Sequence, residues 1–286
     1  MTIEVSIITS CYKMGNYLKF FLEFLPQQTL FKNIEVVLNH HEPTKKEIQL
    51  VKNFQKKYPG RINHLINKSV IPLYSSWNSC IRNSKGKYLA IWNVDDLRTK
   101  NSLELQYNII KNNNVGFVYG NYTSVKEFGS TNGIFINHKE FNKFELTRSM
   151  ILGPFFMFKK SLCNKIGFFD EQFKVAGDFD FAIRLALEFK GKMVKENLGY
   201  YLNAQHGLST KPNSLQPIEK DQVCFRYGIF DKIEKKNIPY LLDYNVKNFL
   251  YQKKYVPIIK FYKKYNQFIK DRIYKKKIKK KYWSWN

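Results

Sequence analysis

The chain has 286 residues, 44% of them hydrophobic and 16% aromatic, which is long and apolar enough to bury a core and excludes general disorder. Lys and Arg number 48 against 23 acidic residues, and this net charge of +25 attracts phosphates, anionic lipids or nucleic acids without selecting among them. The four cysteines lie far apart with no Cys-x-x-Cys pair, so a zinc knuckle and a small disulfide framework are excluded, and a reducing cytoplasm is the expected compartment.

Apolar runs in this sequence are short. The run over residues 5–8 is too short for a secretory leader, and no run reaches the roughly 18 residues that a spanning helix needs. We therefore expect any membrane contact to be peripheral.

The first half of the chain alternates apolar runs with helical patterns. The runs predict strands over residues 5–9, 34–38, 61–66, 88–92 and 116–119, and the patterns between them predict helices over residues 17–25, 45–57, 73–83 and 103–111. Strands separated by helices pair in parallel through right-handed crossovers, so we expect an α/β fold with a mostly parallel sheet. Ligands of such sheets bind beyond the carboxyl ends of the strands, where residues 10–12, 39–42 and 93–96 fall.

The second half is less regular. After Ser124 the pattern loosens into loops, followed by a predicted helix over residues 179–189 and a strand over 199–202. After Pro217 the composition turns to Lys, Tyr, Phe and Ile at helical spacing, so we expect one domain over residues 1–215 and a helical, basic extension over 216–286.

The end of this extension is strongly basic and aromatic. Residues 252–286 hold thirteen Lys or Arg against the single acid Asp271. Apolar residues at helical spacing with basic flanks are typical of an interfacial helix on an anionic membrane surface. An ordinary amphipathic helix packed on the first domain is the alternative.

Two adjacent carboxylates follow the strand predicted over residues 88–92, in the order Asn93-Val94-Asp95-Asp96. Charges at the end of a buried strand are costly unless a ligand or cation compensates them. Mn²⁺ and Mg²⁺ prefer one or two carboxylates together with substrate phosphates, so Asp95 with Asp96 is the predicted metal site. The alternative is that these acids cap the helix that begins near Asn101. Glycine-rich phosphate loops are absent from the sequence.

Five segments together resemble glycosyltransferase family 2, whose members are inverting enzymes of the GT-A fold that use nucleotide-sugar donors. The segments are VSIITSCY (5–12), NIEVVL (33–38), LYSSWNSCIRNSKGKYLAIWNVDD (73–96), IGFFD (166–170) and GDFDFAIRL (177–185). The likeness covers roughly residues 3–210, and its specificity lies in the order and spacing of the motifs.

The resemblance implies a metal-dependent transfer of a sugar, with inversion, from a nucleotide sugar, expected to be a UDP-sugar, to a glycan or lipid-linked acceptor. Asp178 is the implied general base, although a carboxylate just before a helix is also a common N-cap. Asp180 is expected to make a structural contact, with Arg184 one turn later. His206 is the implied third ligand of the metal, with a surface or core position as its alternative.

Donor contacts are expected from side chains at the strand ends and on the third helix. These are Cys11, Tyr12, His40, Asn78 and Asn93, with Asn78 and Asn93 placed near the ribose. Exposure in a loop is the alternative for His40 and His41.

Three positions depart from the family pattern. His40 stands where a nucleobase-reading Asp is usual, Asn93 replaces the first Asp of the D-x-D motif, and Gly177 replaces an acid before the base. A degenerate GT-A domain that binds sugar nucleotide or glycan without turnover is therefore one alternative. A basic nucleic-acid-binding protein is another, but it leaves the two sets of acids unexplained, so we expect no nucleic-acid partner.

Overall fold

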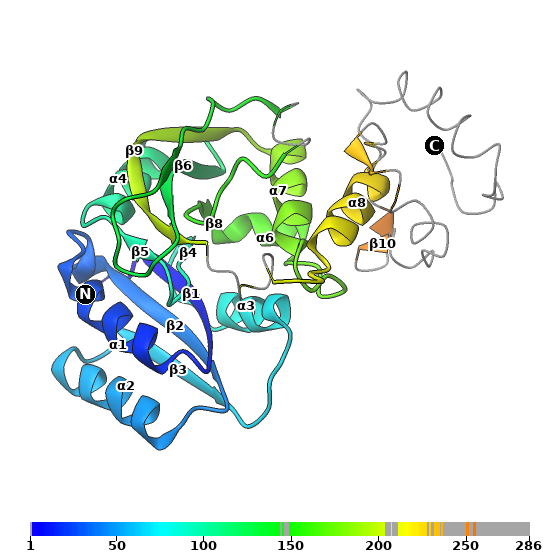
Figure 1. The fold of residues 1–286 in the computed structure, drawn as a ribbon. Helices are drawn as coiled ribbons and strands as arrows, with labels where there is room; N and C mark the ends of the chain where they lie inside the picture. The colour runs from blue at the N-terminus through cyan, green and yellow to red at the C-terminus, as the bar shows by residue number, and fades with distance from the viewer. Residues whose placement is uncertain are drawn as a thin grey trace, which may run out of the picture.

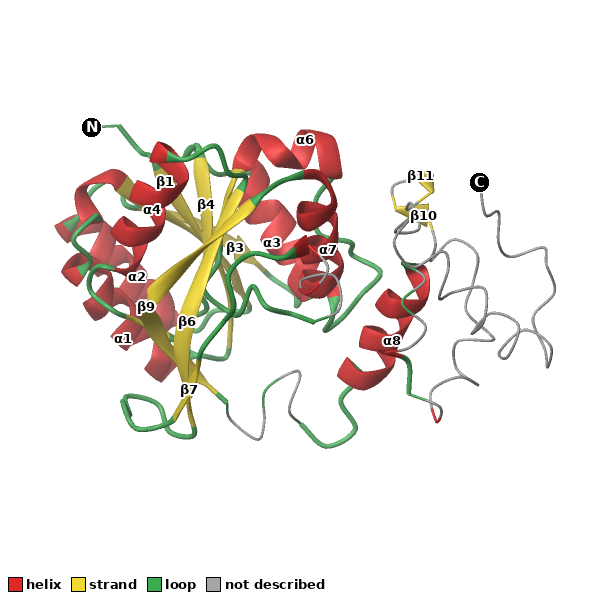
Figure 2. Ribbon diagram, turned by 90° about the horizontal axis from the view of Figure 1, so that it is seen from above, coloured by secondary structure: helices red, strands yellow, loops and turns green. Residues whose placement is uncertain are grey.

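The computed structural model describes residues 2–143, 145, 149–203, 207, 211–227, 229, 232–234 and 236, and the backbone of 250–251 and 254–255. Its centre is a mixed sheet with helices on both faces (Figures 1 and 2). The strand order is β3-β2-β1-β4-β8-β6-β9-β5, and β7 pairs with β6.

The amino-terminal half of the sheet is parallel, as the sequence predicts. Its strands are β1 (Val5–Tyr12), β2 (Ile34–His41), β3 (Ile62–Asn67) and β4 (Tyr88–Ile91), and its crossover helices are α1 (Gly15–Phe24), α2 (Lys45–Lys57) and α3 (Leu73–Arg82). Short 3-10 turns, η1 (Leu25–Gln27) and η2 (Phe31–Asn33), lead from α1 to β2. β1 pairs in parallel with β2 and β4, and β2 pairs in parallel with β3.

The second half of the sheet departs from parallel pairing. It contains β5 (Leu97–Arg98), α4 (Ser102–Asn112), β6 (Phe117–Val125), β7 (Ile134–Ile136), β8 (Met157–Lys159), η3 (Lys160–Leu162), α6 (Cys163–Ile166), α7 (Gly177–Glu188) and β9 (Gly191–Leu202). β8 lies antiparallel between β4 and β6, whereas β9 is parallel to β6 and antiparallel to β5. The loops predicted after Ser124 therefore include strands that complete the sheet.

Local sequence explains several of these elements. Thr44 and Glu47 form a capping box that starts α2, in which each side chain accepts from the other residue's backbone N–H. Gly86 lies so close to β1 that a Cβ atom there would be 2.5 Å from the backbone nitrogen of Ser6. Only glycine allows β4 to start this close to its neighbour.

The two faces of the sheet carry separate apolar cores. α1, α2 and α4 cover one face, where Leu18, Phe21, Val51 and Leu103 are buried, among other residues. α3, α6 and α7 cover the other face, and Figure 2 shows the two helical layers on opposite sides of the strands. The fold is the α/β layered sheet that the sequence predicts.

The helix α8 (Gln216–Arg226) follows, and it packs against α7 (Figure 1). Val223, Cys224 and Tyr227 are buried in the same core as α7. The boundary predicted at residue 215 thus falls just before a helix that belongs to this core.

Part of the extension predicted to be helical contains short strands instead. The segments β10 (Leu250–Tyr251) and β11 (Lys254–Tyr255) pair in antiparallel fashion. The interfacial helix expected within residues 252–286 lies, apart from the two residues of β11, outside the described residues. No helix within the described part of the chain is long and apolar enough to cross a bilayer.

Candidate functional site

The carboxyl ends of three neighbouring strands bring the predicted donor segments together. Ser10 pairs with Asn39 and Tyr12 with His41 at the ends of β1 and β2. Trp92, just after β4, donates its backbone N–H to Ile8 of β1 at 3.4 Å, so residues 93–96 leave the sheet beside β1.

The backbone turns sharply as both strands end. Lys13 after β1 and Glu42 after β2 adopt left-handed backbone conformations, with φ of 53° and 46°. Residues other than glycine rarely adopt this region, and such strain clusters at binding and catalytic sites. The strain therefore marks the same edge of the sheet as the sequence motifs.

The two adjacent acids have different surroundings. Asp96 is 1% exposed, and its Oδ1 accepts from the backbone N–H of Leu202 at 3.1 Å while its Oδ2 accepts from Asn93 at 3.3 Å. Asp95 is half-buried, and no other side chain of the described residues pairs with its carboxylate. Burial raises the pKa of Asp95, and burial and then the charge of Asp95 raise the pKa of Asp96 well above its ordinary value.

This arrangement corrects one alternative, the helix cap. The acids do not cap the following helix, because α4 starts at Ser102 with Asn101 as its N-cap residue. Asp96 joins the acid motif to the end of β9, whereas Asp95 makes no such contact with a side chain of the described residues, and the metal role of both acids stays a prediction. The amide of Asn93 donates to Asp96, an internal role that the ribose interpretation did not include.

A divalent cation fits Asp95 by its chemistry. A partly buried carboxylate without a cationic partner has unsatisfied charge, and oxygen ligands suit Mg²⁺ and Mn²⁺. Among the described residues no cluster of three or more His, Cys, Asp or Glu side chains could hold a metal, so other ligands would come from phosphate or water. His206, the predicted third ligand, lies outside the described residues.

The two neighbouring histidines of β2 point to opposite faces of the sheet, and both are buried rather than exposed in a loop. His40 contacts Nε2 of His64 through Nδ1 at 3.2 Å, and its own Nε2 lies 3.8 Å from Oε1 of Glu47 on α2. These contacts place His40 between the sheet and α2, on the face of the sheet that α2 covers. Burial lowers the pKa values of His40 and His64, in the latter to about 4.

His41 is the histidine that faces α3. Its Nε2 lies 3.0 Å from the hydroxyl of Ser76 and 3.4 Å from that of Ser10, and the Ser76 hydroxyl donates to Ser10 at 2.9 Å. Burial lowers the pKa of His41. The ends of β1 and β2 are thereby connected to the first turns of α3 through a neutral polar network.

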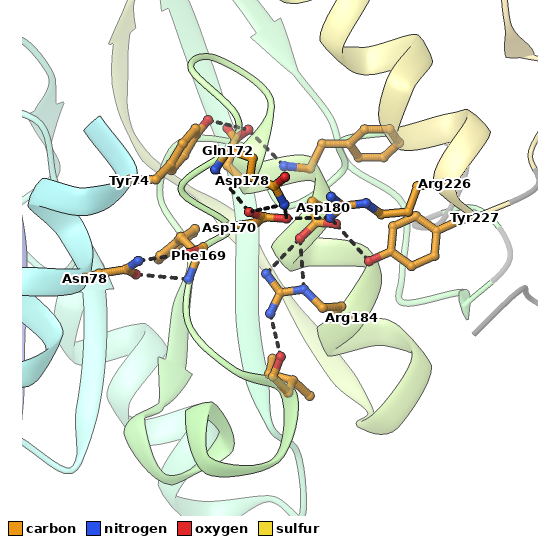
Figure 3. Close-up of polar contacts among 12 residues, drawn as sticks. Tyr74, Asn78, Phe169, Asp170, Gln172, Asp178, Asp180, Arg184, Arg226 and Tyr227 are labelled. Atoms are coloured by element: carbon orange, nitrogen blue, oxygen red, sulfur yellow. Dashed lines mark hydrogen bonds and ion pairs between the residues drawn. The ribbon is translucent and has the colours of Figure 1, made fainter. Parts of the chain in front are cut away.

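The other predicted donor contacts divide between two environments. Cys11 is buried in the core against α1, and burial raises the pKa of its thiol to about 12. Tyr12 is half-buried at the sheet end. Asn78 is committed elsewhere: its Nδ2 donates to the carbonyl of Phe169 and its Oδ1 accepts from the Phe169 N–H, at 2.8 and 3.0 Å (Figure 3). Asn78 therefore holds the 168–171 loop, and its contact with a ribose stays a prediction.

The predicted base lies in the first turn of α7. This helix starts at Gly177, so Asp178 is its second residue, and its N-cap residue is Ala176. The Oδ1 atom of Asp178 accepts from the Phe179 N–H at 2.8 Å and from the Tyr74 hydroxyl at 3.2 Å. Burial raises the pKa of Asp178 to about 6, against which these two donors lower it. A carboxyl with this pKa is a suitable proton acceptor near neutral pH.

A buried ionic cluster supports α7 from the side facing α8 (Figure 3). Asp180 accepts from Arg184 at 2.9 Å, which confirms the predicted structural contact. Arg226 of α8 lies 2.7 Å from Asp170 and 2.8 Å from Asp180, and the Tyr227 hydroxyl donates to Asp180 at 2.9 Å. The charges of Arg184 and Arg226 outweigh burial and lower the pKa of Asp180.

A second residue of α8 fixes the chain just before α7. The buried carboxylate of Glu219 accepts from the backbone N–H groups of Lys174, Val175 and Ala176, at 2.8 to 3.0 Å. These donors directly precede α7, which starts at Gly177, so α8 fixes the point at which α7 begins and with it the position of Asp178. Glu219 also raises the pKa of Asp178, as a smaller contribution than burial.

The residues of α8 were missed by the sequence analysis. The available signal was the spacing of Glu219, Val223 and Arg226, which lie on one face of a helix and mix charges with an apolar residue. A helix face that combines charged and apolar residues predicts that the charges form ion pairs with the domain on which the helix packs. The composition of the surrounding segment instead suggested an appendage.

The mixed sheet between two helical layers, with the acid motif after β4 and a carboxylate in the first turn of α7, is the arrangement expected of a GT-A type sugar transferase. The family described as glycosyl transferase family 2 matches residues 6–167. This match covers more than half of the chain, and the chain belongs to glycosyltransferase family 2.

Relatives in sequence are named as transferases. An uncharacterized glycosyltransferase of Methanocaldococcus jannaschii is 26% identical over 235 residues, which cover 79% of this chain and 78% of that protein. The chondroitin synthase of Pasteurella multocida is 25% identical over 218 residues, or 76% of this chain, but these make up only 22% of the synthase. The sequence relatives and the family match identify this chain as a glycosyltransferase.

Solved structures share the fold. S. aureus TarS 1–349 in complex with UDP-GlcNAc has a TM-score of 0.64 at 17% identity, over 84% of this chain and 79% of that chain. The mannosyltransferase PcManGT of Pyrobaculum calidifontis, in complex with GDP-Man and Mn²⁺, has a TM-score of 0.55 at 15% identity, over 87% and 72%. The likeness confirms the GT-A fold.

Proposed function

We propose that this glycosyltransferase is metal-dependent, moves a sugar from a UDP-sugar to a glycan or lipid-linked glycan, and inverts the anomeric configuration. The observation on which this depends most is the position of the Asp178 carboxyl at the start of α7. Its carboxyl is half-buried at the start of α7, with a pKa raised to about 6 by burial, and it is hydrogen-bonded to α3. The same helix contacts the ends of β1 and β2 through Ser76.

Asp178 acts as the general base in this proposal. Its carboxylate takes the proton of the acceptor hydroxyl while that oxygen forms a bond to the anomeric carbon. The bond from that carbon to the diphosphate oxygen breaks, and the leaving nucleoside diphosphate takes the electron pair. A single displacement inverts the configuration.

Asp95 is the proposed protein ligand of Mn²⁺ or Mg²⁺. A bound cation supplies Lewis-acid neutralisation of the departing diphosphate. The role of Asp96 is to fix the acid motif against β9 through the Leu202 N–H, so that the Asp95 carboxylate keeps its place. The complex of PcManGT with Mn²⁺ supports a metal in a related fold.

The donor proposal rests on the complexes of the structural neighbours. TarS has been solved with UDP and with UDP-GlcNAc, and PcManGT with GDP-Man. We propose UDP because the TarS structures have the higher TM-scores, and a glycan acceptor because the Pasteurella multocida relatives are named chondroitin and hyaluronan synthases.

We also propose a cytoplasmic location, with peripheral attachment to an anionic membrane through residues 252–286. All four cysteines are buried thiols, as suits a reducing compartment. Flotation with vesicles of anionic lipid tests the attachment. The full chain should float, and a chain ending after residue 251 should not. Recovery of both chains in the vesicle fraction to the same extent would refute membrane attachment through residues 252–286.

The test of catalysis is a panel of UDP- and GDP-sugars, with Mn²⁺ or EDTA, assayed for release of nucleoside diphosphate. Turnover should need Mn²⁺ and should fall by about 10³-fold or more in Asp178→Asn, since general-base catalysis contributes 10²- to 10⁴-fold. Glu188→Gln, at the far end of the same helix, is the matched control and should keep full activity. A degenerate domain would instead bind a nucleotide without any turnover, and Asp178→Asn would change nothing.

A further inference from the structure

Tyr74 and Gly177 fit each other closely beside the predicted base. The Tyr74 ring is 1% exposed, and it stacks on Phe169 at 5.8 Å between ring centres and meets Trp77 edge-on at 5.6 Å. A Cβ atom on residue 177 would lie 2.7 and 2.8 Å from Cε2 and Cδ2 of this ring. Any larger residue at position 177 would therefore push the ring from its place.

This fit delivers the Tyr74 hydroxyl to the base. The hydroxyl donates to Oδ1 of Asp178 at 3.2 Å, the same oxygen that accepts from the Phe179 N–H (Figure 3). No side chain of the described residues donates to Oδ2. One oxygen of the carboxylate is thus held by two donors, and the other is available to accept a proton.

We infer, on the basis of the proposed function, that Tyr74 is a positioning residue for catalysis: it fixes the orientation of the Asp178 carboxylate through Oδ1 and stabilises its ionised form. Gly177, which replaces an acid of the family pattern, leaves room for the Tyr74 ring because it has no Cβ atom.

Other charged groups around α7 have separate roles. Glu219 of α8 faces the start of the helix and raises the pKa of Asp178, in the direction opposite to Tyr74. Four buried charges of this region are paired with one another: Asp170, Asp180, Arg184 and Arg226. Asp221 of α8, also buried, accepts from the backbone N–H of Glu234. The phenol of Tyr74 is therefore the side-chain donor that favours the carboxylate.

The direct test is the pKa of Asp178, measured by ¹³C NMR on the full chain labelled at the aspartate carboxyl carbon, with Asp178→Asn assigning the signal. In Tyr74→Phe the ring packing remains and one hydrogen bond to the carboxylate is lost, so the pKa should rise by about one pH unit. Tyr88→Phe, a buried tyrosine on the other face of the sheet, should leave it unchanged. An unchanged pKa in Tyr74→Phe overturns the inference.

The pH profile of Mn²⁺-dependent turnover of UDP-GlcNAc gives a second readout. In Tyr74→Phe the acidic limb of the pH profile should move to higher pH by about one unit. Activity should then be about ten-fold below that of the wild type near pH 5 and little changed near pH 8. Gly177→Ala should move the limb in the same direction. If the limb stays in place while Asp178→Asn abolishes turnover, the inference fails and the proposed function stands. If Asp178→Asn keeps full turnover, the proposed base is wrong, whatever the NMR result.

Discussion

Two adjacent carboxylates illustrate how burial assigns roles at the residue scale. Asp96 is enclosed and accepts from Leu202 and Asn93, and burial, followed by the charge of Asp95, raises its pKa. Asp95, half-buried, has no such side-chain donor among the described residues. A residue that is already satisfied supports the turn, whereas an unsatisfied carboxylate attracts a cation.

We expect Asp95→Asn and Asp96→Asn to differ in Mn²⁺-dependent binding of UDP. A ligand at about 100 times its dissociation constant stabilises the fold by roughly 2.7 kcal/mol. Asp95→Asn should lose the Mn²⁺-dependent part of this gain, because its amide supplies no charge, and Asp96→Asn should keep most of it, because its oxygen can still accept from Leu202. Thermal shift with UDP, with and without Mn²⁺, measures both. The reverse order of effects would refute the assignment.

Asp178 should affect stability in a way that depends on pH. Its folded pKa of about 6 lies above the ordinary 3.8, so the folded state binds more protons between these values, and the free energy of unfolding falls as pH rises through that window. Asp178→Asn removes this contribution. At pH 7.5 the variant should be more stable by at most about 3 kcal/mol, and by less in so far as solvent reaches the carboxyl.

Urea unfolding at pH 4, 6 and 7.5 measures this effect. Glu188→Gln, with an exposed carboxylate that pairs with Lys165, serves as the control and should not alter the pH dependence. A variant Asp178→Asn that is less stable than the wild type at pH 7.5 would contradict the raised pKa.

At the scale of elements, α3 and α8 position the site from two sides. α3 contacts the ends of β1 and β2 through Ser76, the 168–171 loop through Asn78, and the base through Tyr74. α8 holds the start of α7 through Glu219 and its buried acids through Arg226. Asp178 is located between these two supports.

Arg226→Met should destabilise the fold by about 3–5 kcal/mol, because it leaves Asp170 and Asp180 buried with one cation fewer. Asp180 has a lowered pKa, so its stabilising contribution is present at neutral pH and is lost only as pH falls through that lowered value. The loss in the variant should therefore be largest at neutral pH. Urea unfolding tests this, with exposed Arg82→Met as the control. A change below about 1 kcal/mol would show that Arg184 alone satisfies Asp180.

The elements that sequence predicts best are those whose pattern is local. β1 to β4 are continuous apolar runs, and Asp180 meets Arg184 four residues later on the same helix. β9 is longer than predicted because only its last residues show a clear apolar pattern, while its first eight include the exposed Lys192, Lys195 and Glu196. β8 has three residues, too few for any periodicity.

The partners of the site residues could not be predicted for a related reason. Tyr74 and Asp178 are 104 positions apart, and Arg226 lies 56 positions from Asp170. Their contact depends on how α3, α7 and α8 pack, which spacing in one sequence does not reveal. The sequence did single out Asp95 and Asp178 as candidates, because each directly adjoins a recognisable strand or helix.

At the scale of the whole molecule, α8 makes the catalytic domain longer than its composition suggests. The helix contributes Val223 and Tyr227 to the core and Arg226 to the ionic cluster. Burial of an apolar side chain is worth about 1.5–3 kcal/mol and a broken buried ion pair costs about 3–5, which together approach a total stability of 5–15 kcal/mol.

We therefore expect a chain that ends after Ser214 to lose cooperative thermal unfolding, and a chain that ends after Lys236 to retain it. Circular dichroism melts of the two truncated chains measure the difference. A sharp transition in the shorter chain would show that residues 1–214 fold independently and that α8 is an appendage.

The most direct test of metal-dependent transfer at this site is diffraction from crystals soaked with Mn²⁺ and UDP, with the anomalous signal used to locate manganese. We expect a peak about 2.1 Å from an oxygen of Asp95, a distance typical of small divalent cations, with the diphosphate as a further ligand. A peak elsewhere, or UDP bound without manganese at Asp95, would contradict the proposed site.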